Sequence, residues 1–272
     1  MKKILYLDAA LLVLSIMSCT KDDGAADGSA NMIRSYQVLC LSEGEVYAKD
    51  VYTPTFGPDG RIVKIVYEMY TISGDKAKLG RVNIMDFDYE ASAAYATNCW
   101  EIMTPGDLSV IGPYKYSLEF DDGGKMKKVI ENINTNDFAY DGDYLTFFKV
   151  TDQSTEIVNE YTWSGGDLVR MFQDTEYGPY NLTVTYGKEL NPFSDTVDPI
   201  FAIYSGSLPT YSRWNLTGKT STHLPATYKE DFYYDITFSF EYKKDDKGRI
   251  VQVDIKGDDE KGDFDKSIII NY

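Results

Sequence analysis

The chain has 272 residues and a formal charge of −16 at pH 7, because 43 Asp and Glu residues stand against 27 Lys and Arg residues. This length can bury a large β-rich core. The acidic balance argues against nucleic-acid binding, which requires a basic face to neutralise phosphates, and against adhesion to anionic lipid by charge alone.

Residues 1–18 have the pattern of a lipoprotein signal peptide. Lys2 and Lys3 precede an apolar run from Ile4 to Met17, and Ser18 lies directly before Cys19. The apolar run is shorter than the ~20 residues that a transmembrane helix needs. We therefore expect removal of residues 1–18 and lipid attachment at Cys19, which anchors the chain to outer-membrane lipid. An ordinary cleaved signal peptide or a short buried helix is the alternative.

Residues 19–33 are mostly small and polar, so they predict a flexible tether. The sequence Lys21-Asp22-Asp23 resembles the acidic export signal that sends many Bacteroidota lipoproteins to the outer face of the outer membrane. We expect a cell-envelope location at the outer membrane, on either its periplasmic or its surface face.

Residues 34–272 are predicted to form a single β-rich domain. Alternating apolar and polar residues flank turns such as Gly57-Pro58-Asp59-Gly60 and Asp141-Gly142-Asp143, and glycine supplies the positive φ that such turns need. The marker glycines 60, 124, 142, 166 and 248 are unevenly spaced, which excludes a fixed-period repeat. The pattern predicts an all-β, antiparallel meander of consecutive hairpins that forms a large curved sheet or sandwich, with at most one or two short helices.

Two stretches, about 71–113 and 195–230, interrupt the hairpin pattern and are predicted to be irregular insertions. In the first, the alanines of Ala91–Met103 favour a helix before the Pro105-Gly106 stop. The second is rich in Ser, Thr and Pro and carries the only histidine, His223. Loops of this length are usually functional or partly structured.

The 23 tyrosines are the most unusual feature of the composition. Aromatic rings stack on sugars and anchor protein interfaces, although tyrosine also suits a half-buried pleated surface. If a binding surface exists, we expect it in the second irregular stretch, at Tyr204, Tyr211 and Trp214.

Cleavage leaves two cysteines, Cys40 and Cys99, in the folded part. In an oxidising envelope they form either a disulfide or two separate buried thiols. No Cys-x-x-Cys motif occurs, so a redox dithiol or a zinc site has no support.

The sequence offers no catalytic machinery. A catalytic triad would need His223, and no Gly-x-Ser-x-Gly or nucleotide-binding glycine motif occurs. Asp-rich turns at Asp121-Asp122, Asp245-Asp246 and Asp258-Asp259 could hold calcium, but aspartate also suits turns by bonding to its own backbone. We expect no cofactor, no metal and no enzymatic activity.

Several landmarks between residues 110 and 272 resemble a known family. They are Tyr161-Thr162-Trp163, Asn191-Pro192-Phe193, His223-Leu224-Pro225 and a closing Ile-Asn-Tyr strand. Their order resembles an uncharacterised family of Bacteroidota lipoproteins with a domain of unknown function, and the hairpins resemble the Tyr-Asp repeats of Rhs-type shells. The lipoprotein family implies an envelope location and a β-rich fold, and it implies no catalytic residues.

The expected function is that of a non-catalytic envelope lipoprotein which binds a glycan, peptide or partner protein. Two alternatives stay open. One is a carboxylate-dependent enzyme similar to glycoside hydrolases, which work with a pair of acids. The other is a structural component of an envelope assembly.

Overall fold

The computed structural model describes residues 32–89, 94–104, 107–131, 134–152, 156–175, 178–193, 198–204, 217–231, 235–258 and 265–272. The chain divides into the units Met1–Met32 and Ile33–Tyr272, and every strand belongs to the second unit. The predicted signal peptide, most of the tether and Cys19 lie outside the described residues. In the described part of the chain, no helix is long and apolar enough to cross a membrane.

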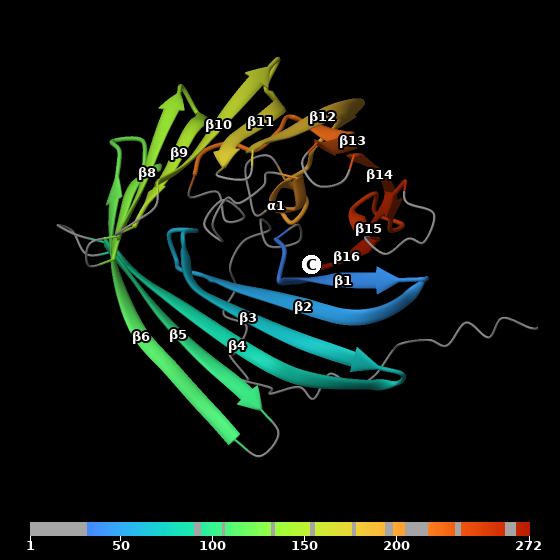
Figure 1. Cartoon of the computed structure of the whole chain (residues 1–272), viewed down its shortest axis with the longest axis horizontal. Coiled ribbons are helices and arrows are strands. Elements are labelled where there is room, and N and C mark those ends of the chain that lie inside the picture. The colour runs from blue at the N-terminus through green and yellow to red at the C-terminus, as the bar shows by residue number, and fades with distance from the viewer. Residues whose placement is uncertain are drawn as a thin grey trace, which may run out of the picture. The chain divides into compact units, whose positions relative to one another are not determined.

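Sixteen antiparallel strands form a closed barrel in which each strand pairs with its neighbours in the sequence and β16 pairs with β1 (Figure 1). The strands are β1 (Ser35–Ser42), β2 (Glu45–Phe56), β3 (Ile62–Ser73), β4 (Lys76–Tyr89), β5 (Ala94–Thr104), β6 (Asp107–Phe120), β7 (Met126–Glu131), β8 (Asn134–Asp141), β9 (Tyr144–Thr151), β10 (Glu156–Ser164), β11 (Asp167–Thr175), β12 (Gly178–Leu190), β13 (His223–Asp231), β14 (Asp235–Lys244), β15 (Ile250–Gly257) and β16 (Lys266–Asn271).

The predicted all-β antiparallel meander is confirmed, but the prediction of an open curved sheet or sandwich is wrong. The barrel closes through pairs that run from Ser35 opposite Asn271 to Cys40 opposite Lys266. Alternation within a strand shows which side chains are buried, and it is the same in a sandwich and in a barrel. The pairing of the first strand with the last is therefore invisible in the local pattern.

The predicted helix over Ala91–Met103 is also wrong, because this stretch contributes β5. Ala96 pairs with Phe87 of β4 and with Tyr116 of β6, and its side chain is fully buried. Pairing on both sides overrides the helix propensity of alanine, which is only a weak preference. The stretch 71–113, predicted to be irregular, thus carries all of β4 and β5 and the first part of β6.

The marker glycines lie at one end of the barrel, which we call the plug end. They occupy the turns after β2, β6, β8, β10 and β14, and all have positive φ between 57° and 89°. In an up-and-down barrel every second turn returns to the same end, whatever the strand lengths. In two of these turns Asp121 and Asp245 accept hydrogen bonds from backbone N–H groups of their own turn at 2.8–3.0 Å, as the turn interpretation predicted.

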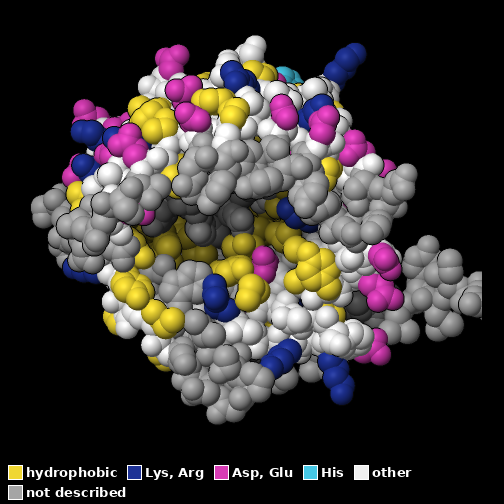
Figure 2. Space-filling view, viewed as in Figure 1, with side chains coloured by type: hydrophobic (Ala, Val, Ile, Leu, Met, Phe, Trp, Pro, Cys, Tyr) yellow, Lys and Arg dark blue, Asp and Glu magenta, His cyan; other side chains and the backbone are white. Residues whose placement is uncertain are grey.

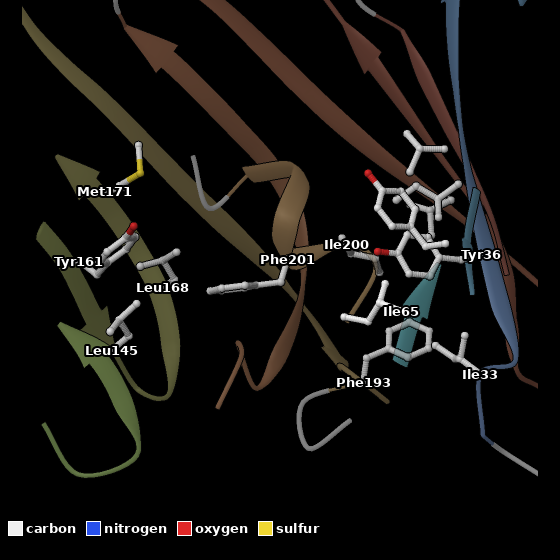
Figure 3. Close-up of a cluster of buried hydrophobic side chains, with 14 of the residues drawn as sticks. Ile33, Tyr36, Ile65, Leu145, Tyr161, Leu168, Met171, Phe193, Ile200 and Phe201 are labelled. Atoms are coloured by element: carbon white, nitrogen blue, oxygen red, sulfur yellow. The ribbon is translucent and has the colours of Figure 1, made fainter. Parts of the chain in front are cut away.

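The long connection between β12 and β13 starts at the plug end and folds into the barrel. Its described residues, 191–193, 198–204 and 217–222, are called the plug, and they include the short helix α1 (Phe201–Tyr204). Figure 1 shows α1 inside the ring of strands. Ile200 and Phe193 lie beside Ile33, Tyr36 and Ile65, whereas Phe201 points toward the side of Leu145, Tyr161 and Leu168 (Figure 3). The plug therefore joins the cores of opposite walls.

The wall is apolar on its inner face and charged on its outer face. In β14, Ile236, Phe238 and Phe240 are buried, whereas Asp235 and Glu241, which flank them, are exposed. Ion pairs of 2.7–3.5 Å join neighbouring strands at outward positions: Lys64–Asp86, Lys128–Asp137, Lys149–Glu156, Lys229–Asp235, Lys243–Asp254 and Lys256–Glu241. The barrel thus buries its hydrophobic residues inside itself.

Candidate functional site in the barrel lumen

On β1 and β16 the inner face changes from buried and apolar near the plug to half-buried toward the other end of the barrel, which we call the distal end. On β1, Tyr36 and Val38 are buried and Cys40 is half-buried. On β16, Ile268 is buried and Lys266 is half-buried. Side chains and the plug therefore fill the plug half of the lumen more completely than the distal half.

Polar side chains gather on the inner face where this change occurs. Asp50 pairs with the inward-facing Val38, and Glu230 pairs with the inward-facing Leu182 and Ile236, so both acids face the lumen. The same register argument gives the full set, called the lumen belt: Asp50, Tyr67, Arg81, Asn83, Asn159, Gln173, Tyr180, Glu230 and Lys266.

The space-filling view shows a hollow at the centre of the barrel (Figure 2). Hydrophobic side chains line most of its visible wall, with basic and acidic side chains among them. The visible surface of this hollow is thus mainly apolar and carries a few charged groups, which is the usual composition of a ligand site.

The two acids of the belt are hydrogen-bonded to tyrosines. The Tyr67 hydroxyl donates to Asp50 Oδ1 at 3.2 Å, and the Tyr180 hydroxyl donates to Glu230. Burial raises the pKa of Glu230, while nearby Lys266 and the Tyr180 hydrogen bond oppose this shift. Both carboxyl groups therefore have a donor within the belt.

Lys266 differs from these acids. Its charge lowers the pKa values of Glu230 and of the Cys40 thiol, so its ammonium group is within electrostatic reach of both. Within the described residues, however, it makes no hydrogen bond and no ion pair. The lumen therefore contains a cation without a contact partner in the described chain.

Stacked aromatic rings form part of the inner wall. Tyr36, Tyr52 and Tyr67 lie side by side on β1, β2 and β3, with 4.8 Å between the centroids of each neighbouring pair. Tyr228 and Phe238 stack at 4.4 Å on β13 and β14. All of these rings except Tyr67 are buried, so the stacks belong to the packed core of the inner wall.

Two buried polar groups lie on β10. Asn159 is 0 % exposed, and neither atom of its amide has a hydrogen-bond partner in the described structure; the same holds for the hydroxyl of Tyr161. Burial raises the pKa of Tyr161 well above its usual value. An unpartnered buried polar group costs ~1–3 kcal/mol, so this part of the lumen is not optimised for stability alone.

The predicted aromatic binding residues are not assembled in the described structure. Tyr204 is the last residue of α1, and its side chain lies outside the described part, as do Tyr211 and Trp214. Their role stays a prediction. His223 begins β13, where its backbone N–H donates to Asp167 Oδ1 and its Nδ1 lies 2.8 Å from Asp167 Oδ2. It fastens the end of the plug to β11.

Cys40 carries a free thiol on the inner face, and burial raises its pKa while Lys266 opposes the shift. Cys99 belongs to β5, which β2, β3 and β4 separate from β1, and its side chain lies outside the described residues. Because Cys40 is free, this structure does not contain the alternative of a disulfide between the two cysteines. Among the residues that the structure describes, no group of three or more His, Cys, Asp and Glu could hold a metal.

Sequence reasoning missed the lumen belt. The sequence does contain a signal for these inward positions. Residues two apart in a strand point to the same face, so Lys266 shares the face of Ile268 and Ile270, and Asn159 shares that of Tyr161.

Comparison with solved structures finds porin-like proteins from Bacteroides, a genus of the Bacteroidota. One from Bacteroides uniformis has a TM-score of 0.65 and 14% identity, over 88% of this chain and 96% of that chain. One from Bacteroides vulgatus has a TM-score of 0.47 and 14% identity, over 88% of this chain and 98% of that chain. The first likeness shows a shared barrel fold.

Comparison with protein-family models gives no match, and comparison with curated proteins gives none either. The resemblance to a lipoprotein family of unknown function, and to Tyr-Asp repeats, therefore stays a prediction.

Proposed function

We propose that the protein is a non-catalytic, lipid-anchored protein of the cell envelope. The outer wall of its barrel is exposed to water and not to lipid, and the barrel binds a ligand in its lumen. The observation that supports this most is the distribution of charge on the wall. Ion pairs join neighbouring strands at outward positions, and most of the buried inward positions are apolar.

Barrels that span a membrane have the opposite pattern, with an apolar outer band and a polar interior. A lysine or arginine on a lipid-facing wall costs about 2–4 kcal/mol near the middle of the bilayer. Six outward ion pairs, each with a lysine, would make insertion of this wall unfavourable. In this proposal the lipid on Cys19, and not the barrel, attaches the protein to the membrane.

The envelope location draws support from two sides. The sequence of residues 1–23 predicts a lipoprotein exported to the outer membrane, and the barrel with the higher TM-score is described as porin-like and comes from a Bacteroides species. The hollow in the barrel supports ligand binding because apolar side chains, with a few charged groups among them, line its visible wall. A glycan, a peptide or a segment of a partner protein remains the expected ligand class at this level.

Cell fractionation tests the proposal. The wild-type chain is expected in the membrane fraction, whereas a Cys19→Ala chain carrying a cleavable signal peptide in place of residues 1–18 is expected in the soluble envelope fraction without detergent. The reason is that only the lipid binds the membrane. If the Cys19→Ala chain stays in the membrane and needs detergent for extraction, the wall itself contacts lipid and the proposal is wrong.

A further inference from the structure

We propose that the tether holds the barrel with its plug end toward the membrane and its distal end toward the water, so that a ligand enters the lumen from the water side. This inference rests on the proposed function, in which the lipid on Cys19 anchors the chain, and it adds the direction from which the lumen is reached.

The folded unit begins at the plug end of the barrel. Ile33 is only 4 % exposed and lies beside Phe193 and Ile200 of the plug (Figure 3). The Arg34 N–H donates to the carbonyl oxygen of Asn271, the last residue of β16, at 2.8 Å. Buried apolar contacts and a hydrogen bond therefore fix the place where the tether joins the barrel.

The direction of the strands identifies this end independently. Strand β1 runs from the plug end to the turn at Glu43 and Gly44, and β16 returns to the plug end at Asn271. Turns alternate between the two ends in an up-and-down barrel, and the marker-glycine turns after even-numbered strands define the plug end. Both ends of the folded unit therefore lie at the plug end.

The tether is short compared with the barrel. Only residues 20–32 separate Cys19 from Ile33, and a polar chain of this length has a root-mean-square span of ~20 Å. The 12 residues of β2, tilted by about 40° from the barrel axis, extend about 30 Å along it. Placing the distal end on the membrane would require a strongly stretched tether, which costs conformational entropy. The covalent connection therefore favours the plug end next to the membrane.

The orientation decides which ligands reach the lumen. Buried side chains and the plug fill the plug half, whereas Cys40 on β1 and Lys266 on β16 are half-buried toward the distal end. With the plug end next to the membrane, the less filled half of the lumen faces the water. We therefore expect the ligand to be a molecule dissolved in the water and not a lipid taken from the anchoring membrane.

Energy transfer from a dye on the barrel to an acceptor in the membrane tests the orientation. The lipid-modified full mature chain, with Cys40→Ser and Cys99→Ser, is bound to phosphatidylcholine vesicles that contain rhodamine-labelled lipid. One chain carries the dye after Asp246→Cys, in the exposed turn after β14 at the plug end, and the other after Asp75→Cys, in the exposed turn after β3 at the distal end. We expect at least about twofold more transfer from position 246, since roughly 30 Å of barrel separate the two ends.

A longer tether is the matched control. Insertion of about 40 Gly and Ser residues between Gly28 and Ser29 raises the root-mean-square span of the tether to ~40 Å, which exceeds the length of the barrel. The lipid and the barrel are unchanged, so transfer from the two dye positions should become similar. If either labelled chain fails to fold, the pair Asp122→Cys at the plug end and Asp235→Cys at the distal end takes its place, since both residues are exposed.

The outcomes separate this inference from the proposed function. A lipid-modified chain that does not bind the vesicles would contradict the lipid anchor, and the orientation would be wrong with it. Bound chains that show equal transfer from both positions, or more transfer from position 75, would overturn only the orientation. A difference that survives the longer tether would show that the tether does not set the orientation, and it would overturn the inference as well.

Discussion

At the scale of single residues, Asp198 holds the plug together. Its carboxylate accepts hydrogen bonds from Asn191 Nδ2 at 2.8 Å and from the backbone N–H groups of Ile200 and Phe201 at 2.9 Å. The side chain is fully buried, so no water can replace these partners. Asp198 thus links the start of the plug to the turn that carries its apolar residues.

Replacement of Asp198 by alanine should destabilise the barrel. The change leaves three donors without their acceptor, and we expect the free energy of unfolding in urea to fall by about 3 kcal/mol. Asp246→Ala is the control, since Asp246 is exposed in the turn after β14 and its loss should change the free energy by less than ~0.5 kcal/mol. Equal effects of the two substitutions would show that the buried network contributes nothing.

The same residue predicts a pH dependence. Burial raises the pKa of Asp198, and its hydrogen bonds only partly oppose this. A raised folded-state pKa gives a contribution that is fully present below the unfolded pKa of about 3.9 and is lost as pH rises through the folded value. We therefore expect wild-type protein to lose stability relative to Asp198→Asn as pH rises from 4 to 7, measured by urea unfolding. A difference that stays constant or changes in the opposite direction would refute this assignment.

At the scale of elements, the plug is fixed by close backbone contacts with two turns of the plug end. The Lys219 N–H donates to the Asp143 carbonyl oxygen at 2.9 Å, and the Thr222 N–H donates to that of Gly166 at 3.0 Å. Gly218 has a φ of +86°, and a Cβ there would lie 2.3 Å from the Asp143 carbonyl oxygen. Only glycine fits at this contact.

Gly218→Ala should therefore loosen the plug. We expect a loss of roughly 2–4 kcal/mol in unfolding free energy and faster hydrogen exchange of the Lys219 amide, because the backbone must move away from Asp143. Gly142→Ala is the matched control: Gly142 also has positive φ, +57°, but nothing lies within 4 Å of the added Cβ. Its cost should be about 1 kcal/mol. Similar costs and similar Lys219 exchange in both variants would contradict the close contact.

The hairpins were predictable because their turns carry strong local signals. Gly60, Gly124 and Gly248 need positive φ, and the strands on both sides alternate cleanly. The strand β5 was not predictable from local patterns. Ala94 and Ala96 are strand residues because β5 pairs with β4 and with β6, and not because alanine has a local preference for strands. The sequence marked the plug only as a break in the hairpin pattern, because its contacts with β11 and with the turn before β11 join residues more than 50 positions apart.

At the scale of the whole molecule, closure and the lumen belt follow from pairings that no local pattern contains. Ser35 meets Asn271 across 236 positions of the sequence. Lys266, Asp50 and Glu230 come from strands far apart in the chain, and only the closed barrel brings them onto one continuous inner face. The sequence therefore predicted the parts of the wall but not the site that the wall encloses.

The central claim is that the barrel wall is exposed to water and that a ligand binds inside the barrel. A bulky side chain introduced into the lumen tests this claim most directly. Ala48 is half-buried on the inner face of β2 opposite Cys40, and Thr53 is exposed on the outer face of the same strand. Titration of N-phenyl-1-naphthylamine into detergent-free protein should show saturable fluorescence that Ala48→Trp abolishes and Thr53→Trp leaves unchanged. Equal dye binding by both variants, or no binding by the parent chain, would contradict a ligand site in the lumen.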